Sequence, residues 1–290
     1  MKGILIYDKE SAEYNKNGIA IYLKEAKKHG MTLTLVYYEE LYYGIMDNLF
    51  YIEYEGKLVT DLDFAINRSR DYRLAKHLES MGVRVFNNSF VNRIGNHKWE
   101  TYEYLLGYQI PMPDTIFVAN QNIGQYLSSC KNKVVVKAVH GHGGNQVCCY
   151  HPDRPEEMES IIKTMANEDV VIQPFIKGNG QDLRVYVIGE DIIGAVLRTA
   201  TKDFRSNYSL GGRVELYQLN ENEISKVRQI TNCLSLDYAG IDFIIQEDGT
   251  LLFNEIEDVV GARMLYECSN IDAIGLYMEY VFKTLNNSSQ

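Results

Sequence analysis

Three carboxylates cluster in residues 253–258 (FNEIED), a stretch near the end of the chain that otherwise has the apolar character of a buried strand. Buried carboxylates lose hydration and repel one another, so they require a cationic partner. The preceding Asp248-Gly249 pair is typical of a two-residue hairpin turn, and that turn places Asp242 directly opposite Glu255. Glu257 shares their face because side chains alternate along a strand. Oxygen ligands of this kind suit Mg²⁺, and the alternative is an exposed acidic rim at a strand end.

A glycine-rich turn joins two apolar strands within residues 133–150. Its glycines include Gly141, Gly143 and Gly144, and backbone amides freed by glycine can bind phosphate oxygens. Lys137 lies inside the first apolar strand and needs an anion, for which a nucleotide phosphate would serve. The spacing is that of neither a Walker loop nor a Rossmann fingerprint. A plain hairpin whose lysine reaches outward to solvent is the alternative.

Residues 173–176 (QPFI) end another apolar strand and enter a glycine-containing linker. A strand end of this kind can offer backbone groups to an adenine, and a simple exit turn is the alternative. Lys98, near the start of a predicted helix, is a weaker candidate for binding phosphate when it is considered alone.

Arginines and an aspartate gather in the segment that follows. Asp182 and Arg184 open a hairpin on one face, Arg198 lies on the return strand, and a polar loop then carries Arg205 and Asn207. Arginine is the usual partner of carboxylate and phosphate groups. A structural ion pair with one of the 39 acidic residues is the alternative for each arginine.

The elements that must position these side chains change in kind near residue 94. Before it, strands alternating with helices predict a small α/β domain with a parallel sheet. The expected strands are residues 3–7, 32–37, 63–67 and 83–86, and the expected helices are residues 18–29 and 71–81.

After residue 94 the pattern predicts an α+β arrangement with antiparallel strand pairs. The expected helices are residues 96–106, 155–165, 221–235 and 271–285. The expected strands are residues 133–139, 146–150 and 170–173, with hairpins at residues 182–200 and 238–257.

Composition excludes several classes of function. The chain has 290 residues and a formal net charge of −10, which disfavours a nucleic-acid partner. It lacks an apolar run of about eighteen residues, so no membrane partner is expected, and its start lacks the features of a signal peptide. Five cysteines, odd in number and without CxxC spacing, predict a reducing cytoplasm and argue against a zinc site.

The order of these features resembles the ATP-grasp superfamily, and within it the branch of the RimK-like glutamate ligases and LysX-type ligases. The likeness covers nearly the whole chain, and the segment from Phe204 to Gly212 is its most branch-specific part. It implies an N-terminal α/β pre-ATP-grasp domain over residues 1–93 and an ATP-grasp domain over residues 94–290. Within the second domain, a glycine-loop lid subdomain is expected at about residues 114–175 and a catalytic subdomain at about residues 176–290.

Carried over position by position, the resemblance implies a nucleotide site for ATP. Two lysines would contact the phosphates, the glycine loop would close over them, and the strand end at residues 173–176 would border the adenine. The implied nucleotide-contacting residues are Lys98, Lys137, His140, Gly141, Gly143, Gly144, Gln173, Pro174, Phe175, Ile176 and Asp182.

The resemblance also implies a metal site and catalytic residues. Arg184 is one catalytic candidate, and Arg205 and Asn207 would face the reacting phosphoryl and carboxylate groups. The implied ligands of Mg²⁺, with Mn²⁺ as an alternative, are Asp242, Glu255 and Glu257.

Several positions depart from the family pattern. Glu257 stands where relatives usually have asparagine, which adds negative charge at the metal. The glycine loop carries His140 and His142 in place of a common Lys-Pro start, and Arg263 follows Gly261 where relatives often have smaller residues. The last two departures leave the substrate and the closure of the loop open.

The activity that the resemblance implies is an ATP-dependent carboxylate–amine ligase that forms an amide bond through an acylphosphate. The implied partners are a small-molecule carboxylate, with glutamate as one candidate, and an amine acceptor that is an amino acid, a peptide or a protein tail. A homo-oligomer is also consistent with the resemblance. The alternatives are a small-molecule kinase and a non-catalytic nucleotide-sensing protein on the same scaffold.

Overall fold

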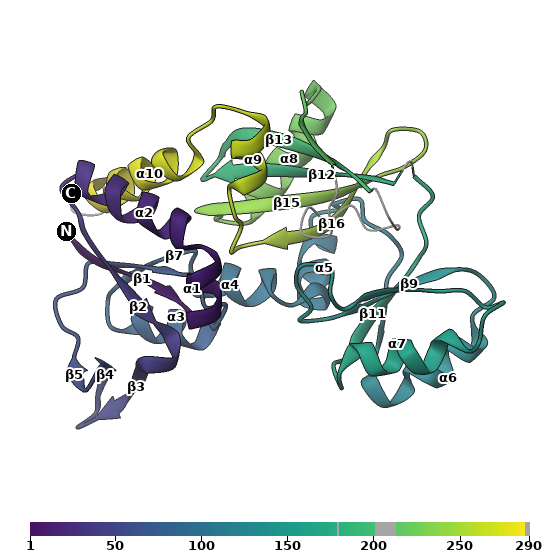
Figure 1. The fold of residues 1–290 in the computed structure, drawn as a ribbon, viewed down its shortest axis with the longest axis horizontal. Coiled ribbons are helices and arrows are strands. Elements are labelled where there is room, and N and C mark those ends of the chain that lie inside the picture. Colours follow the sequence, from purple (N-terminus) through teal and green to yellow (C-terminus); the bar gives the residue numbers. More distant parts are fainter. Residues whose placement is uncertain (179, 201–212, 288–290) are drawn as a thin grey trace.

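The computed structural model describes residues 1–178, 180–200 and 213–287. The described strands form four sheets. Figure 1 shows the N-terminal sheet and its helices on the left, a smaller middle sheet with two helices on the right, and a large sheet above them.

The N-terminal sheet is parallel, as the alternation of strands and helices predicts. Its strands lie in the order β2-β1-β6-β7, and every neighbouring pair is parallel. Ile4, Leu5 and Ile6 are buried because both faces of the sheet are covered. The bounds are β1 (Lys2–Tyr7), β2 (Thr32–Tyr37), β6 (Phe64–Asn67) and β7 (Arg84–Phe86), which confirm the four predicted strands.

Helices cover both faces of the N-terminal sheet. One face packs against α2 and the C-terminal helix α10, and the other face packs against α3. The predicted helices at residues 18–29, 71–81 and 271–285 are confirmed, whereas α1 and α4 were not predicted, because six or seven residues carry too few apolar repeats. The bounds are α1 (Lys9–Tyr14), α2 (Lys16–Lys28), α3 (Tyr72–Ser80), α4 (Ser89–Gly95) and α10 (Ala273–Asn287).

A three-stranded antiparallel sheet extends from the N-terminal part and was also not predicted. A short 3-10 helix, η1 (Tyr38–Glu40), leads into it. Asp47 and Asn48 form the first turn with positive φ angles of 52° and 62°, the conformation of a tight hairpin. The strands are β3 (Leu41–Met46), β4 (Leu49–Tyr54) and β5 (Lys57–Leu58).

The middle sheet is antiparallel, with the strand order β10-β9-β11-β8. Two helices pack on one of its faces around Ile123, Leu127 and Ile161. The predicted strands at residues 133–139, 146–150 and 170–173 and the predicted helix at residues 155–165 are confirmed. The bounds are β8 (Ile116–Val118), η2 (Asn120–Asn122), α6 (Ile123–Ser129), β9 (Val134–Ala138), β10 (Val147–Tyr150), α7 (Glu157–Met165) and β11 (Val170–Pro174).

The large sheet is also antiparallel, with the strand order β14-β13-β12-β15-β16. Its apolar face packs against α8 and α5 through residues such as Val185, Phe243 and Val227. Both predicted hairpins and the helices at residues 96–106 and 221–235 are confirmed. The bounds are α5 (Lys98–Leu106), β12 (Gln181–Ile188), β13 (Asp191–Thr199), β14 (Arg213–Leu216), α8 (Glu221–Cys233), β15 (Tyr238–Ile245), β16 (Leu251–Glu257) and α9 (Arg263–Cys268).

The turn between β15 and β16 differs from the predicted two-residue turn. Gln246 N donates to the Thr250 carbonyl at 3.0 Å, so residues 247–249 form a three-residue loop. Gly249 takes the left-handed position of this loop, with a φ of 81°. A type I turn followed by a left-handed glycine is the common three-residue hairpin, and the Asp-Gly pair suits it as well.

A β-bulge in β16 restores the predicted register further along the hairpin. Phe243 pairs with Phe253, but the next pair is Asp242 with Glu255, so Asn254 is the extra residue. The predicted pairing of Asp242 with Glu255 is therefore confirmed, although the route to it is different. The bulge also brings the side chain of Asn254 toward the middle sheet.

The two ends of the described chain lie close together, because α10 packs against α2 (Figure 1). The predicted domain boundary at residues 93 and 94 falls inside α4, and one core cluster contains residues from both sides of that boundary. The division into domains stays a prediction. Within the described residues, the helices are all too short or too polar to cross a bilayer.

Candidate active site

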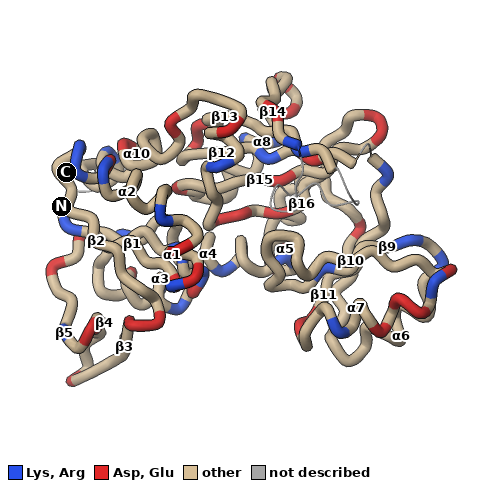
Figure 2. The backbone as a smooth tube through the Cα atoms, in the orientation of Figure 1, with Lys and Arg blue, Asp and Glu red and all other residues tan. Residues whose placement is uncertain are grey.

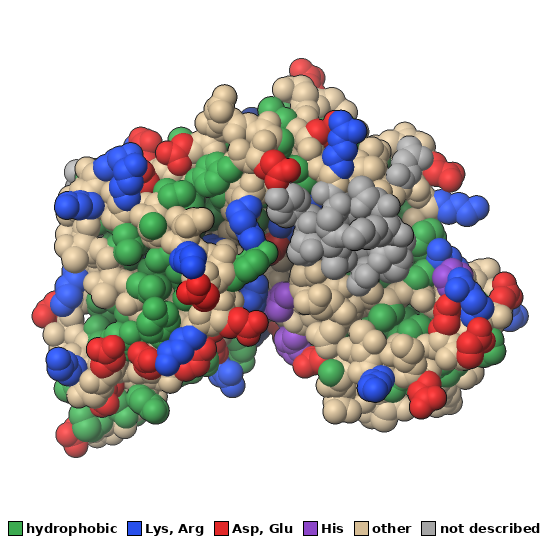
Figure 3. Space-filling model, viewed as in Figure 1, with side chains coloured by type: hydrophobic (Ala, Val, Ile, Leu, Met, Phe, Trp, Pro, Cys, Tyr) green, Lys and Arg blue, Asp and Glu red, His purple; other side chains and the backbone are tan. Residues whose placement is uncertain are grey.

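One cavity, of about 250 Å³, lies between the middle sheet and the end of the large sheet. Figure 3 shows the surface hollowed in this central region, with charged and histidine side chains along its walls. The cavity collects residues that are more than 150 positions apart in the chain. Every residue predicted to contact the nucleotide, with the exception of His140, lines it: Lys98, Lys137, Gly141, Gly143, Gly144, Gln173, Pro174, Phe175, Ile176 and Asp182.

Lys137 lies on β9 and points toward β16. Only 7% of its surface is exposed, and its Nζ donates to Oδ1 of Asn254 at 2.7 Å. Burial lowers the pKa of Lys137 to about 8, with Glu255 opposing this shift and Lys98 adding to it. A buried lysine whose hydrogen-bond acceptor is a neutral amide is suited to an anionic ligand such as a phosphate.

Nucleotide binding is expected to weaken as the pH rises through about 8, the pKa of Lys137. Below that pH the side chain is a cation and attracts phosphate, and above it the side chain becomes neutral. The dissociation constant of Mg-ADP should therefore rise by up to about tenfold per pH unit above the pKa. Calorimetric titrations between about pH 6.5 and 9.5 would measure it.

The matched control for this prediction is Lys137→Arg, because arginine stays protonated throughout this range. The rise in the dissociation constant should be absent in that variant. An identical rise in the arginine variant would assign the titration to another group and contradict the role given to Lys137.

Lys98 connects α5 with the glycine loop. His97 caps α5, and Lys98 Nζ donates to the Gly141 carbonyl at 2.5 Å. The same Nζ lies 3.4 Å from Oε2 of Glu255. Lys98 is thus held between the glycine loop and a carboxylate of β16.

The glycine loop turns through two left-handed residues. Gly143 and Gly144 have φ angles of 64° and 77°, which side chains rarely adopt. A Cβ at Gly143 would meet nothing within 4 Å, so its backbone borders open space. The loop can therefore present its backbone to a ligand in the cavity.

His140 lies elsewhere than predicted. Its Nδ1 is 2.8 Å from Oε2 of Glu168, its side chain is 55% exposed, and it does not line the 250 Å³ cavity. The turn after β9 directs this ring outward, where it also contacts His97 edge to face. His142 is the histidine of the loop that faces a cavity.

The strand end at residues 173–176 forms the apolar side of the 250 Å³ cavity. Gln173 is buried and donates to Thr115 Oγ1 at 2.9 Å, which fixes the end of β11. Phe175 N donates to the Lys133 carbonyl at 3.1 Å. Ile176 lies on this wall, with Ile244 and Ile245 of β15 also lining the cavity. A slot with apolar walls and nearby backbone groups suits a planar base such as adenine.

A ladder of charged side chains crosses the polar face of the large sheet. Arg184 binds Asp242 through two hydrogen bonds of 2.7 Å, and its Nη1 lies 2.5 Å from Glu257. Arg198 binds Asp182 and, at 2.7 Å, Asp242. Figure 2 shows these basic and acidic segments of β12, β15 and β16 close together near the middle of the molecule.

Asp242 is the centre of this ladder. The residue is fully buried, and both of its oxygens accept hydrogen bonds from arginines. Burial alone would raise the pKa of Asp242, but the charges and hydrogen bonds of Arg184 and Arg198 outweigh burial and lower it to about 2. Asp242 is therefore ionised at neutral pH and holds both guanidinium groups in place.

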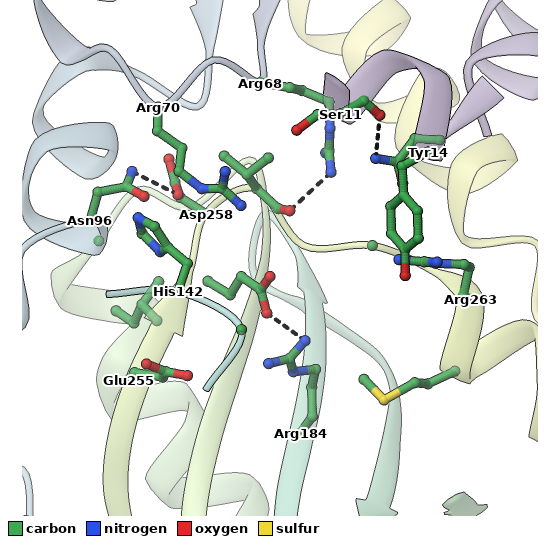
Figure 4. Close-up of a pocket in the computed structure, with 18 of the residues that line it drawn as sticks. Ser11, Tyr14, Arg68, Arg70, Asn96, His142, Arg184, Glu255, Asp258 and Arg263 are labelled. Atoms are coloured by element: carbon green, nitrogen blue, oxygen red, sulfur yellow. Dashed lines mark hydrogen bonds and ion pairs between the residues drawn. The ribbon is translucent and has the colours of Figure 1, made fainter. Parts of the chain in front are cut away.

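A second cavity, of about 330 Å³, lies between the large sheet and the carboxyl ends of the N-terminal strands. Figure 4 shows Arg68 and Arg70 reaching into it from one side and Glu255 and Arg184 from the other. Lys98, Gly143 and Glu255 line both cavities, so the two cavities meet at these three residues.

Most of the residues that line the two cavities come from one region of the chain, and this region identifies the family. Residues 95–281 match the family model of the RimK-like ATP-grasp domain. The chain belongs to this family.

The RimK-like chain is similar to several proteins of known name. It is 31% identical over 233 residues to N-acetylaspartylglutamate synthase A of Homo sapiens, covering 77% of this chain and 58% of that protein. It is 28% identical to beta-citrylglutamate synthase B of Homo sapiens, covering 76% and 58%, and 28% identical to a probable alpha-L-glutamate ligase of Haemophilus ducreyi, covering 72% and 69%. The RimK-like chain thus spans about three fifths of the length of the first two relatives.

Solved structures confirm an ATP-grasp fold. A RimK domain ATP-grasp protein from Sphaerobacter thermophilus has a TM-score of 0.71 at 18% identity and covers 97% of this chain and 99% of its own. D-cycloserine synthetase DcsG has a TM-score of 0.72 at 16% identity, with 98% and 100% covered. The ATP-grasp ligase PsnB, solved with Mg and ADP, has a TM-score of 0.69 at 15% identity, with 99% and 98% covered.

ATP-grasp ligases use Mg²⁺, and two glutamates of the RimK-like site have the chemistry that this ion prefers. The side chains of Glu255 and Glu257 are 29% and 32% exposed, and both line the second cavity. Mg²⁺ in nucleotide sites usually takes one or two carboxylates together with phosphate oxygens, which these two residues can provide. The oxygens of Asp242 accept hydrogen bonds from Arg184 and Arg198. Within the described ranges, no three acidic, histidine or cysteine side chains form one metal-binding group.

The binding of a metal by Asp242, Glu255 and Glu257 together therefore stays a prediction. Arg205 and Asn207, two of the predicted catalytic residues, lie outside the described residues. Arg184, the third, lines the second cavity.

Sequence reasoning missed two contributions to the RimK-like site. Asn254 reaches Lys137 only because of the bulge in β16, for which the sequence carries no local signal. Arg68 and Arg70 come from the N-terminal part. The sequence did carry a signal for these two arginines, because they directly follow a strand of a parallel sheet. Ligands usually bind at the carboxyl ends of such strands.

Proposed function

We propose that the chain is an ATP-dependent ligase that joins a carboxylate to an amine through an acylphosphate. The observation that carries this proposal is the meeting of the two cavities at Lys98, Gly143 and Glu255. A nucleotide in the first cavity would place its terminal phosphate at this junction, where an acid in the second cavity can reach it. The names of the relatives, synthases and ligases of glutamate compounds, support an amino acid such as glutamate as one substrate.

In the proposed reaction, a substrate carboxylate attacks the γ-phosphate of ATP and ADP leaves. The amine then attacks the acylphosphate, an amide bond forms and phosphate leaves. Lys98 and Lys137 would offset the negative charge of the phosphates, which is the main contribution of a protein to phosphoryl transfer. Glu255 and Glu257 would hold Mg²⁺, with Asp242 as the third predicted ligand, and the ion would supply positive charge next to the phosphates. Mn²⁺ would suit the same oxygen ligands.

Three arginine and asparagine residues complete the proposed machinery. Arg184 sits between Asp242 and Glu257 and would keep the Glu257 carboxylate in place. Arg205 and Asn207 are proposed to contact the reacting phosphoryl and carboxylate groups, on the strength of the family resemblance.

The five cysteines form no disulfide bond with one another, which supports a reducing compartment such as the cytoplasm. A homo-oligomer is part of the same proposal and rests on the family resemblance.

The test is ADP release by the purified protein with Mg-ATP, a panel of amino acids and small carboxylates, and hydroxylamine as a surrogate amine. Hydroxamate formed together with ADP would establish acylphosphate chemistry and name the acid. A stable phosphorylated product without hydroxamate would support a kinase instead. Tight nucleotide binding without ADP release for any acid or amine would contradict the ligase and support a nucleotide sensor.

A further inference from the structure

Three arginines on one wall of the 330 Å³ cavity, Arg68, Arg70 and Arg263, have no acidic partner within the part of the chain that the structure describes. No carboxylate oxygen of the described residues lies within 4.0 Å of their guanidinium nitrogens. The arginines on the opposite wall are different, because Arg184 and Arg198 are both paired with aspartates. The cavity therefore has one neutralised wall and one cationic wall.

Arg68 is a buried cation that forms no ion pair with an acidic side chain of the described residues. It is 7% exposed, its Nη2 donates to the carbonyls of Val259 and Val260 at 2.9 Å each, and its Nε has no hydrogen-bond partner. The rings of Tyr7 and Tyr22 lie 5.4 and 5.9 Å from its Cζ. Burying an uncompensated charge is costly, so a site of this kind favours an anion.

Arg70 adopts a strained backbone that directs it into the cavity. Its φ is 63°, a left-handed conformation that is uncommon for a residue with a side chain. The neighbouring residues stabilise this turn, since Ser69 Oγ donates to Asn67 Oδ1 at 2.7 Å and Asn67 Nδ2 donates to the Asp71 carbonyl at 3.1 Å. Strain that the surroundings maintain is common at binding sites. Figure 4 shows Arg70 extending toward the centre of the cavity.

The other charged group on this wall is Asp258. Burial raises its pKa to about 6, and the positive charges of Arg70 and Arg68 oppose that shift without forming an ion pair with it. Its oxygens accept hydrogen bonds from Asn92 at 2.6 Å and Asn96 at 2.9 Å. Arg263 completes the wall from α9, with its guanidinium 4.0 Å from the ring centre of Tyr14. Three cations thus face one carboxylate, and that carboxylate is bonded to amides.

The topology of the N-terminal sheet also favours a ligand here. In the strand order β2-β1-β6-β7, β1 and β6 are the two central strands. The chain passes from β1 to β2 at one edge of the sheet and from β6 to β7 at the other edge, so the direction of winding reverses between β1 and β6. Crevices at the carboxyl ends of such strands are the usual ligand sites of open parallel sheets. Tyr7 ends β1, and Arg68 and Arg70 follow β6 directly.

We infer that Arg68, Arg70 and Arg263 bind a substrate carboxylate other than the one that is phosphorylated. The site would thereby select an acid or an amine that carries an additional carboxylate, and this inference rests on the proposed ligase function. The arginine wall belongs to the N-terminal part and to α9, so it lies across the cavity from the junction at Glu255 where phosphate would react. This separation would hold one end of the substrate while the other end reacts.

A binding experiment tests the inference without requiring turnover. The full-length protein, saturated with Mg²⁺ and a non-hydrolysable ATP analogue, is titrated calorimetrically with matched acid and amide pairs: glutamate and glutamine, aspartate and asparagine, succinate and succinamate. In at least one pair the compound with the additional carboxylate should bind about 10- to 100-fold more tightly, as expected for a carboxylate on arginines. Arg70→Gln should reduce this preference to less than about threefold.

The matched control is Arg228→Gln, an exposed arginine on α8 that lines neither cavity and should retain the preference. Arg70→Lys should recover part of the preference, because the positive charge remains. Absence of any preference in the wild-type protein, or an unchanged preference in Arg70→Gln, would overturn the inference. A protein that shows the preference but releases no ADP would contradict the ligase proposal and leave the arginine site standing.

Kinetics then identify which substrate carries the bound carboxylate. With hydroxylamine as the amine, an increase of about 10- to 100-fold in the KM for the acid in Arg70→Gln assigns the site to the acid. An unchanged KM for the acid combined with an increased KM for the natural amine assigns it to the amine. The KM for ATP should not change in either case, and a change confined to the KM for ATP would contradict the inference.

Discussion

The Glu255→Ala protein is expected to release ADP about 100- to 1000-fold more slowly than the wild type, while folding normally. Among the described residues, Glu255 is the carboxylate that lines both cavities, and its carboxylate lies 3.4 Å from Lys98 Nζ. Removing it would take away a proposed metal ligand at the point where phosphate and acid meet. Its side chain is 29% exposed, so the loss should affect the reaction far more than the stability of the fold.

The measurement is the steady-state rate of ADP release with the acid identified in the hydroxylamine assay, together with the denaturation curve of each protein. Glu247→Ala is a suitable control, because Glu247 is an exposed residue in the loop of the same hairpin. A wild-type rate in Glu255→Ala would rule out the proposed metal site.

Replacing Asp242 with alanine is expected to lower the free energy of unfolding by about 3–5 kcal/mol. Asp242 is fully buried and binds both Arg184 and Arg198 at 2.7 Å. Without it, two buried guanidinium groups lose their shared counter-ion, and this cost exceeds that of losing the hydrogen bonds alone. Turnover should fall as well, because Arg184 would no longer be fixed beside Glu257.

Urea denaturation followed by circular dichroism would measure this loss. Asp191→Ala, an exposed aspartate at the start of β13 in the same sheet, should change the unfolding free energy by less than about 0.5 kcal/mol. A denaturation midpoint for Asp242→Ala equal to that of the wild type would show that the two arginines do not depend on Asp242.

Acid provides a second check on Asp242. Its pKa is lowered from 3.8 to about 2, so its ionic contribution is fully present above pH 3.8 and is lost as the pH falls through about 2. The difference in unfolding free energy between wild type and Asp242→Ala should therefore be constant near neutral pH and should shrink below about pH 4. A difference that does not change with pH would contradict the charge pairing.

The residues predicted to contact the nucleotide come together in one cavity where their signals in the sequence were local. Lys137 on an apolar strand, the glycine turn and the strand end at residues 173–176 each carried their own pattern, and the structure brings them to one cavity. His140 does not line this cavity, and the sequence could not show that. Nothing in a glycine turn specifies which of its two histidines faces inward, and the contact of His140 with Glu168 is decided by the neighbouring strand.

The pairing of charges could not be predicted from the sequence. Period-two alternation placed Asp182 and Arg184 on one face of the first hairpin and Asp242 and Glu255 on one face of the second, but it did not specify which cation would meet which anion. In the structure β12 lies beside β15, so the guanidinium of Arg184 contacts both oxygens of Asp242. The ladder depends on strand order, which is a property of the assembled sheet.

By itself, then, the sequence determined the fold class, most of the helices and strands, and which residues would line the 250 Å³ cavity, with the exception of His140. These depend on apolar periodicity and turn chemistry, which act over a few residues. Only the tertiary structure decided that Asn254 reaches Lys137, that Asp242 is bound by arginines, and that Arg68 and Arg70 face the large sheet across a second cavity. The physical reason is that these contacts join residues far apart in the chain, and their partners are selected by sheet order, a bulge and the docking of the N-terminal part.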